Sequence, residues 1–138
     1  MYYVVYGFLW LISLLPLRIL YILSDGLYGI IFYVLKYRRA VALQNLRIAF
    51  PEKTEAERLR IAKKFYRNLI DTFIETIKML TVSRRFLLKR FTANWEEVNK
   101  YRNGDRSLQI LLGHNFNWEW GNSVGPVHLA FPFLVVYM

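Results

Sequence analysis

An uncharged N-terminus constrains this chain most. Residues 1–17 contain no charged side chain, and only Gly7, Ser13 and Pro16 interrupt their apolar character. A helix needs about 20 mainly apolar residues to cross a hydrocarbon core about 30 Å thick, so this run is at the short limit for a span. Arg18 and residues 25–26 separate it from a second apolar run at 27–35.

Three arrangements of this region fit the pattern. One is a single spanning helix that continues past Arg18, whose side chain can reach the membrane surface. Another is a pair of membrane-embedded helices that turn near residues 24–26. The last is a buried helical hairpin in a soluble core. A cleaved signal peptide is not expected, because no basic segment precedes the apolar run.

The basic residues that follow predict an orientation. Lys36, Arg38 and Arg39 come directly after the second apolar run, whereas no basic residue precedes the first. Positive residues favour the cytoplasmic side of a membrane. We therefore expect a membrane anchor at residues 1–36 and a cytoplasmic-side domain at residues 37–138.

A long amphipathic helix is predicted in the middle of the chain. Residues 54–57, Thr-Glu-Ala-Glu, form a capping-box sequence, in which Thr54 accepts from the amide of Glu57 and the Glu57 carboxylate reaches back. Apolar residues then recur at steps of three and four, which predicts a helix of about seven turns. The predicted apolar face comprises Ala62, Phe65, Tyr66, Leu69, Ile70, Phe73, Ile74, Ile77 and Leu80. The predicted polar face comprises Arg60, Lys63, Lys64, Arg67, Asp71 and Lys78.

The charge of the chain points to an anionic partner. The formal net charge is +9, and residues 36–90 hold fifteen Lys and Arg against five Asp and Glu. A second basic cluster at 84–90 includes Arg84 and Arg85. Basic residues on a helix often form only a solvated face. Because each one near an anionic leaflet contributes on the order of 1 kcal/mol and these follow an apolar N-terminus, a membrane-facing role is the other interpretation. Nucleic acid is not expected, because no nucleic-acid motif accompanies the charge and the N-terminus is apolar.

The candidate catalytic residues are His114 and Glu119. They follow an apolar run at 108–112 that is typical of a short buried strand, and a second strand is predicted at 133–138. On one continuous helix, five residues turn about 500°, which leaves the two side chains about 140° apart. They meet more easily if His114 lies in a loop and Glu119 in the first turn of the next helix, with Asn115 or Asn117 as its cap.

That arrangement suits general-base catalysis. A carboxylate bonded to one imidazole nitrogen fixes the tautomer and leaves the other nitrogen free to take a proton. The chain has no cysteine and no Gly-x-Ser-x-Gly sequence, so the expected nucleophile is a hydroxyl of the substrate. A structural role for the pair and catalysis both remain open on the pattern alone. The other histidine, His128, is interpreted as structural, and no metal site is expected.

The sequence resembles the lipid A biosynthesis acyltransferases of Gram-negative bacteria, the lauroyl and myristoyl transferases. Their motif, often Gly-His-x-Gly-Asn-Trp-Glu, is matched by Gly113-His114 and by Asn117-Trp118-Glu119, with Trp120-Gly121 after it. Asn45-Leu46, the Ala-Phe-Pro of residues 49–51, and the apolar N-terminus also fit that family. One departure is Phe116, where the family commonly has glycine.

The resemblance implies a mechanism and partners. His114 would deprotonate a hydroxyl of a lipid A precursor, Glu119 would orient the imidazolium, and the alkoxide would attack an acyl thioester on acyl carrier protein. Asn117, Arg84 and Arg85 would contact substrate or acyl carrier protein. No cofactor and no metal is implied. The implied location is the bacterial inner membrane, with the catalytic part on the cytoplasmic side.

The implied fold class is α/β, with membrane-associated helices and a long amphipathic helix ahead of the start of an acyltransferase-type sheet. Members of this family are about twice as long, so we expect this chain to be an N-terminal half with little activity by itself. Two alternatives are a glycerolipid acyltransferase, which uses a similar His-x4-Asp pair, and a non-catalytic, membrane-anchored basic module that binds lipids or a protein partner.

Overall fold

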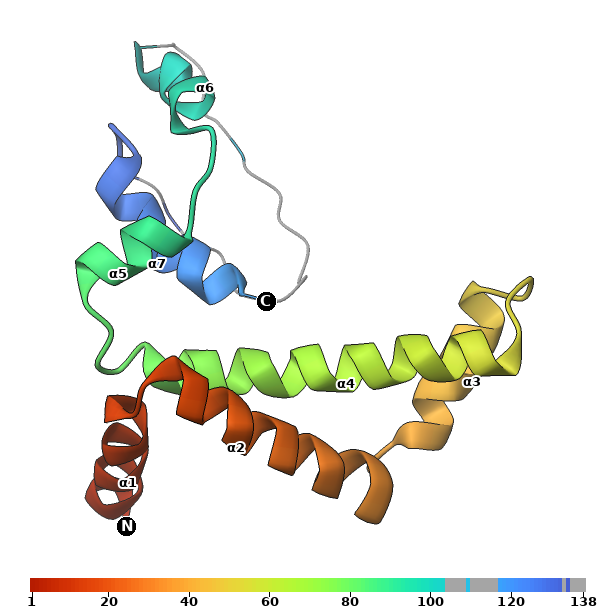
Figure 1. Ribbon diagram of the computed structural model, residues 1–138. Helices are drawn as coiled ribbons and strands as arrows, with labels where there is room; N and C mark the ends of the chain where they lie inside the picture. Colours follow the sequence, from red (N-terminus) through yellow and green to blue (C-terminus); the bar gives the residue numbers. More distant parts are fainter. Residues whose placement is uncertain (104–108, 110–116, 133, 135–138) are drawn as a thin grey trace. The chain divides into compact units, whose positions relative to one another are not determined.

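The computed structural model describes residues 1–103, 109, 117–132 and 134, which fall in two units. We call residues Met1–Thr81 the N-terminal unit and residues Val82–Met138 the C-terminal unit. Every regular element in the described ranges is a helix (Figure 1).

The predicted α/β class is wrong for the part of the chain that the structure describes, because it contains helices and no strand. The prediction depended on the family resemblance and on strands predicted from the apolar runs at 108–112 and 133–138. These lie outside the described residues except for Gln109 and Leu134, and neither of those two belongs to a helix or strand. Short apolar runs do not distinguish a strand from other buried structure. In the N-terminal unit, helices instead bury their apolar faces against one another.

The N-terminal apolar region forms two helices that meet at a proline. Helix α1 spans Tyr2–Leu14, and α2 spans Leu17–Gly29 before continuing as a π-helix, η1, over Ile30–Val34. Pro16 is the N-cap of α2, where its missing N–H removes no helical hydrogen bond. The predicted turn at residues 24–26 is wrong, because those residues lie inside α2. By length and composition alone, the one described segment able to cross a membrane is Leu17–Val34.

The long amphipathic helix and its capping box are confirmed. Helix α3 spans Arg39–Ala49, and α4 spans Glu55–Lys78, which at 3.6 residues per turn is about seven turns. The Thr54 hydroxyl accepts from the Glu57 amide at 3.3 Å, and the Thr54 amide donates to the Glu57 carboxylate at 2.8 Å. The sequence pattern therefore located the start of α4 correctly.

The core of the N-terminal unit lies where α2 runs along α4 (Figure 1). Four predicted core residues of α4 are buried, and they are Ala62, Tyr66, Ile70 and Ile74. Phe32 of η1 is fully buried, and its ring meets the Tyr66 ring edge-on at 5.2 Å. Phe65 and Phe73, which were predicted on the same face, are exposed instead.

Two residues predicted on the polar face of α4 bind the N-terminal helices. The Lys78 ammonium donates to the carbonyl oxygens of Ser13 at 2.7 Å and Leu15 at 3.0 Å, and the Thr81 hydroxyl donates to the Ser13 carbonyl at 2.6 Å. Asp71 accepts a hydrogen bond from Ser24. Because the last carbonyl oxygens of a helix lack hydrogen-bond donors within it, Lys78 supplies donors for the carbonyl groups at the end of α1.

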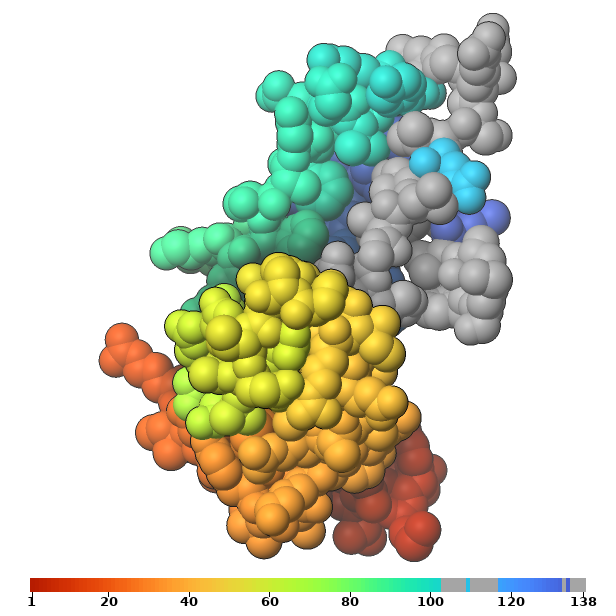
Figure 2. Space-filling model, turned by 90° about the vertical axis from the view of Figure 1, so that its right-hand side faces the viewer, coloured from red at the N-terminus to blue at the C-terminus, as the bar shows by residue number. Residues whose placement is uncertain are grey.

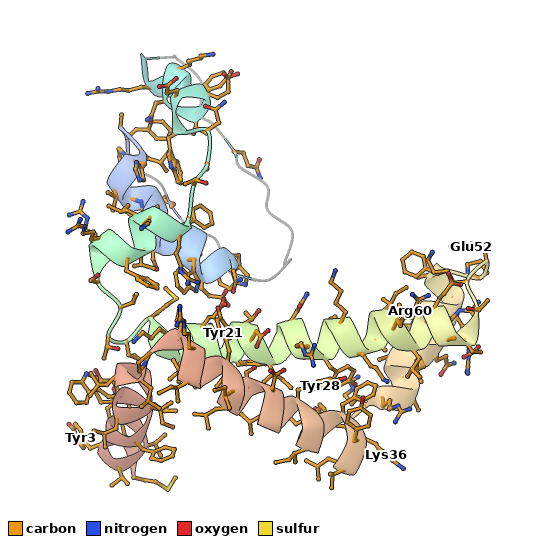
Figure 3. The ribbon with its side chains drawn as sticks, viewed as in Figure 1. Tyr3, Tyr21, Tyr28, Lys36, Glu52 and Arg60 are labelled. Atoms are coloured by element: carbon orange, nitrogen blue, oxygen red, sulfur yellow. The ribbon has the colours of Figure 1, made fainter. Side chains whose placement is uncertain are left out.

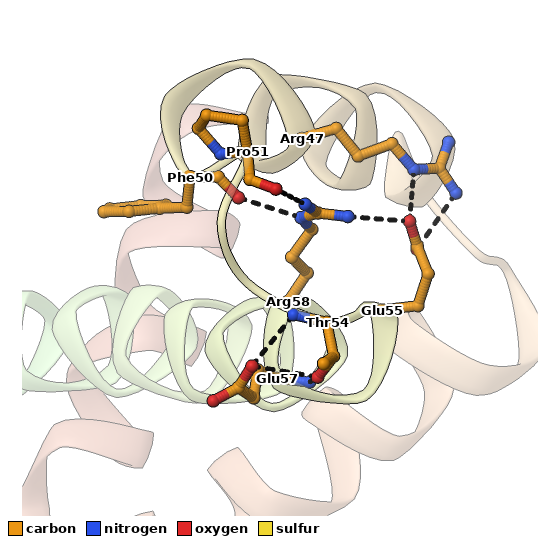
Figure 4. A network of polar contacts seen from close by, with 7 residues as sticks. All are labelled: Arg47, Phe50, Pro51, Thr54, Glu55, Glu57 and Arg58. Atoms are coloured by element: carbon orange, nitrogen blue, oxygen red, sulfur yellow. Dashed lines mark hydrogen bonds and ion pairs between the residues drawn. The ribbon is translucent and has the colours of Figure 1, made fainter.

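The turn between α3 and α4 is held by Arg58 (Figure 4). Its guanidinium donates to the carbonyl oxygens of Phe50 at 3.1 Å and Pro51 at 2.7 Å, and to the Glu55 carboxylate at 2.9 Å. Arg47 of α3 approaches the same carboxylate through two nitrogens, at 2.9 and 3.1 Å. These contacts join the end of α3 to the first turn of α4.

The C-terminal unit contains three short helices and a 3-10 turn in its described residues. They are α5 at Arg84–Arg90, α6 at Trp95–Asn99, the 3-10 helix η2 at Lys100–Asn103, and α7 at Trp118–His128. Asn94 caps α6 through its side chain, which accepts from the Glu97 amide at 3.3 Å. Helix α5 packs on α7.

Candidate functional site

The predicted site residues all belong to the C-terminal unit. Glu119 and Asn117 lie at the start of α7, and Arg84 and Arg85 lie at the start of α5. His114, the predicted base, lies outside the described residues. The structure therefore describes the carboxylate side of the candidate pair.

Glu119 occupies the first turn of α7, as the spacing predicted. Its side chain is partly buried, and Oε2 is buried with no hydrogen-bond partner among the described residues. A buried carboxylate oxygen without a donor is unfavourable, because it has lost water without replacement. This oxygen consequently needs a donor, and an imidazole N–H supplies one of the right chemistry.

Asn117 is the N-cap residue of α7, but it does not cap in the predicted way. Its side chain makes no capping hydrogen bond, and its backbone is left-handed, with φ of 60°. Asparagine adopts this conformation more readily than most other residues. Asn117 therefore turns the chain sharply into α7, while its carbonyl accepts from the Trp120 amide at 3.1 Å.

Arg84 and Arg85 begin a strongly basic helix. Both are exposed, and α5 also carries Lys89 and Arg90 near its end. Ser83 caps this helix by accepting from the Phe86 amide at 3.3 Å. No salt bridge joins either arginine to Glu119 within the described ranges, so both guanidinium groups remain candidates for an anionic ligand.

The far end of α7 is fixed by contacts that the sequence did not reveal. The His128 ring stacks on Trp95 of α6, with centroids 5.0 Å apart and planes 7° apart. The Asn99 side chain donates to the His128 carbonyl and accepts from the Ala130 amide, both at 2.9 Å. These contacts agree with a structural role for His128. Nothing in the sequence indicated this role for Asn99, since a single asparagine is common in loops and caps.

Close packing also positions the start of α7. A Cβ atom added at Gly121 would lie 3.1 Å from Cζ of Phe91, so glycine allows the residue after α5 to approach α7 closely. Trp120 is buried beside Gly121, and its indole nitrogen has no hydrogen-bond partner in the described part of the chain. Sequence reasoning placed Trp120-Gly121 in the motif but assigned neither residue a packing role.

Chemically, the start of α7 presents a dry carboxylate oxygen at the N-terminal, partially positive end of a helix. The carboxylate can accept a hydrogen bond from an N–H group and stabilise that group when it becomes positively charged. Backbone amides at a helix N-terminus favour a developing negative oxygen. Both functions are needed when a base removes a proton from a hydroxyl and that oxygen attacks an acyl group.

Comparison with known proteins identifies a relationship across most of the chain. The sequence model of the family described as bacterial lipid A biosynthesis acyltransferase matches residues 1–124. The match includes α1 to α6, the motif region at 113–120 and the start of α7. Searches of curated proteins and of solved structures gave no match.

Proposed function

Because the chain belongs to the bacterial lipid A biosynthesis acyltransferase family, we propose that it acts in a membrane-bound O-acyltransferase. The reaction moves a fatty acyl chain from an acyl-carrier-protein thioester to a hydroxyl of a lipid A precursor. The observation that carries the proposal is the family match over residues 1–124, a range that contains the positions of His114 and Glu119.

His114 is the proposed general base. It takes the proton of the acceptor hydroxyl, and the oxygen attacks the thioester carbonyl. Collapse of the tetrahedral intermediate then releases the acyl-carrier-protein thiolate, which takes up a proton. Glu119 is proposed to accept from the other imidazole nitrogen and to stabilise the imidazolium. Its buried Oε2, which lacks a donor among the described residues, supports this role.

The proposal also assigns roles to Arg84, Arg85 and Asn117. Arg84 and Arg85 are proposed to meet acidic acyl carrier protein or the phosphates of the acceptor, because both are exposed on a helix with four basic residues. Asn117 is proposed to contact substrate from the start of α7. The reaction as proposed requires no cofactor, and its location is the cytoplasmic face of the inner membrane.

Acyl transfer from acyl-carrier-protein thioester to a lipid A precursor tests the proposal. The 138-residue chain by itself is assayed, and so is any longer protein that contains it. We expect little turnover from the 138-residue chain. General-base catalysis typically contributes 10²- to 10⁴-fold, so His114→Ala should lower kcat/KM by at least about 100-fold. Glu119→Gln should also lower it, whereas Glu96→Gln, at an exposed carboxylate of α6, should not.

The same assay separates the two alternative functions. Transfer to glycerol 3-phosphate in place of the lipid A precursor would assign the protein to the glycerolipid acyltransferases. Biological activity that survives His114→Ala and Glu119→Ala, but is abolished by charge reversal at Arg84 and Arg85, would indicate a non-catalytic basic module. Near-normal turnover by His114→Ala would remove the assigned base.

A further inference from the structure

Helix α2 has two faces of different chemistry. One face carries an exposed apolar stripe, which continues through η1 and comprises Ile19, Ile22, Leu23, Leu27, Ile30 and Val34. The other face buries Leu20, Ser24 and Tyr28. At about 100° per residue, the stripe and the buried face lie on roughly opposite sides of the helix. Only one side of α2 is therefore suited to hydrocarbon.

Polar and charged side chains also join α2 to α4. Tyr21 donates to the Glu75 carboxylate, and Ser24 donates to Asp71 at 2.6 Å. Asp25 pairs with Arg67 at 3.1 Å, and the two side chains are 62% and 58% exposed. Asp25 stands near the middle of Leu17–Val34, the segment long enough to cross a membrane. A spanning α2 would thus place an exposed ion pair near the bilayer centre, where charges are strongly disfavoured.

Helix α4 adds a second obstacle to a spanning arrangement. It runs along α2 (Figure 1), so both helices would enter the bilayer together. Yet α4 exposes Arg60, Lys64 and Arg67 along its length. Helix α1 by itself has 13 residues, or about 20 Å, which is short of a hydrocarbon core of about 30 Å. The packing of this unit therefore opposes a membrane-spanning α2.

Basic residues border the apolar stripe at the end of η1. Lys36 and Arg38 are exposed beside exposed Val34, Leu35 and Tyr37. Figure 3 shows Lys36 at this end of the segment. In Figures 1 and 2, the start of α1 and the end of η1 extend away from α4 on the same side, at the lower edge of both views.

Helix α1 adds further apolar surface on that side. Its exposed large side chains include Tyr3, Phe8, Trp10 and Leu11. Tyrosine and tryptophan favour the membrane–water boundary, and lysine and arginine favour anionic headgroups. The combination of an apolar stripe, aromatic residues and a basic border matches the surface of an anionic bilayer.

We propose that the N-terminal unit lies in the plane of an anionic bilayer and does not cross it. The apolar stripe and α1 enter the outer part of the acyl region, Lys36 and Arg38 bind lipid headgroups, and α4 stays on the aqueous side. This inference rests on the membrane location in the proposed function and is independent of the catalytic roles of His114 and Glu119.

Vesicle binding by the full chain tests the apolar stripe. Ile22→Asp is compared with Ile48→Asp of α3, because the two isoleucines are 70% and 74% exposed and differ mainly in position. We expect Ile22→Asp to lower partition onto phosphatidylglycerol–phosphatidylethanolamine vesicles at least about tenfold, and Ile48→Asp to change it little. Circular dichroism checks that both variants stay helical. Equal loss in both variants, or none in Ile22→Asp, would overturn the role of the stripe.

The basic border is tested by neutral substitutions. Lys36→Gln with Arg38→Gln should weaken binding to the anionic vesicles about ten- to thirtyfold. Arg60→Gln with Lys64→Gln on α4, a change of the same net charge, should weaken it much less. If both double variants weaken vesicle binding equally, binding depends only on total charge, and the role of the basic border is overturned. If the chain does not bind vesicles and elutes as a dimer, the apolar stripe would instead contact a second copy of the chain, and the proposal would be overturned.

Topology is tested by thiol labelling, since the chain has no cysteine of its own. Arg18→Cys and Lys36→Cys introduce thiols at the two ends of the α2–η1 segment. A membrane-impermeant maleimide is applied to intact spheroplasts and then to lysed ones. In-plane binding predicts that both sites are protected in intact spheroplasts and that both react after lysis. Labelling of one site and protection of the other in intact spheroplasts would show a spanning helix. Because His114→Ala should leave these readouts unchanged, this proposal and the catalytic proposal can fail separately.

Discussion

Arg58 shows how one buried charge can define a turn. Its residue surface is only 9% exposed, yet its guanidinium reaches two carbonyl oxygens and a carboxylate. Five donors in a planar fork suit this geometry, whereas a lysine offers a single nitrogen. The Ala-Phe-Pro stretch of residues 49–51 therefore takes its shape partly from a side chain several residues later.

Replacing Arg58 should destabilise the N-terminal unit. Arg58→Ala removes charge-assisted hydrogen bonds and leaves the Phe50 and Pro51 carbonyls without these donors. We expect a loss of about 2–4 kcal/mol in the free energy of unfolding, measured by urea denaturation with circular dichroism. Arg60→Ala, two positions along on an exposed part of α4, should change it by less than about 0.5 kcal/mol. Similar effects of the two variants would contradict the role of the turn contacts.

Residue-level prediction from sequence succeeded where the cause was local. Thr54 and Glu57 stand three positions apart, and their capping bonds depend on that spacing alone. The burial of Arg58 was not predictable in this way, because it depends on where the carbonyls of a preceding turn lie. Likewise, the spacing placed Glu119 in a first helical turn, but the dry environment of its Oε2 depends on packing.

At the scale of elements, the start of α4 should make stability depend on pH. Bonds from Arg47 hold the pKa of Glu55 below its usual value, and bonds from the Thr54 amide and hydroxyl do the same for Glu57. A carboxyl whose pKa is lowered by folding stabilises the fold above its unfolded pKa of about 4.3. That contribution is lost as the pH falls from about 4.3 through the lower folded pKa. The urea midpoint should therefore drop between pH 5 and pH 3.

Substitution identifies the carboxyls responsible for the pH dependence. Glu55→Gln with Glu57→Gln should lower the urea midpoint at pH 7 and flatten its decline toward pH 3. Glu52→Gln, at an exposed carboxylate near the same turn, serves as the control. An unchanged pH profile in the double variant would contradict the assignment.

Lys78 should hold α1 against α4. Lys78→Met keeps most of the aliphatic length but loses both hydrogen bonds to the α1 terminus. We expect a loss of about 1–3 kcal/mol in unfolding free energy, with faster amide hydrogen exchange concentrated in α1. Lys64→Met, at an exposed position of α4, should leave the exchange of α1 unchanged. Uniform exchange changes across α2 and α4 would argue against a local attachment.

Element prediction was reliable for helices with a clear period and poor for short runs. The three- and four-residue spacing located α4, but it could not tell which charged side chains would turn toward another helix, as Asp71 and Lys78 do. Asp25-Gly26 looked like a turn, yet both residues continue α2, where Asp25 gains Arg67 as a partner. The sheet was expected from the family resemblance and from two apolar runs, which are too short to distinguish a strand from a helix.

At the scale of the whole molecule, the two units should be separable. A chain that ends at Thr81 keeps α1 to α4 and every contact of Arg58 and Lys78 described above. With anionic vesicles, it should give a helical circular dichroism spectrum and should lose stability on Arg58→Ala about as much as the full chain does. A largely unfolded spectrum would show that the N-terminal unit depends on the remaining residues.

The polar contacts between α2 and α4 also concern how the protein is made. The partners of Ser24 and Tyr21 are 47 and 54 positions further along the chain. At synthesis rates of about 5–20 residues per second, roughly 2–10 seconds pass before the ribosome supplies them. During that interval, α2 is an apolar segment without its polar neighbour, which insertion machinery could treat as a span. If the N-terminal unit lies in the membrane plane as proposed, its polar contacts to α4 form only after α2 has already been synthesised.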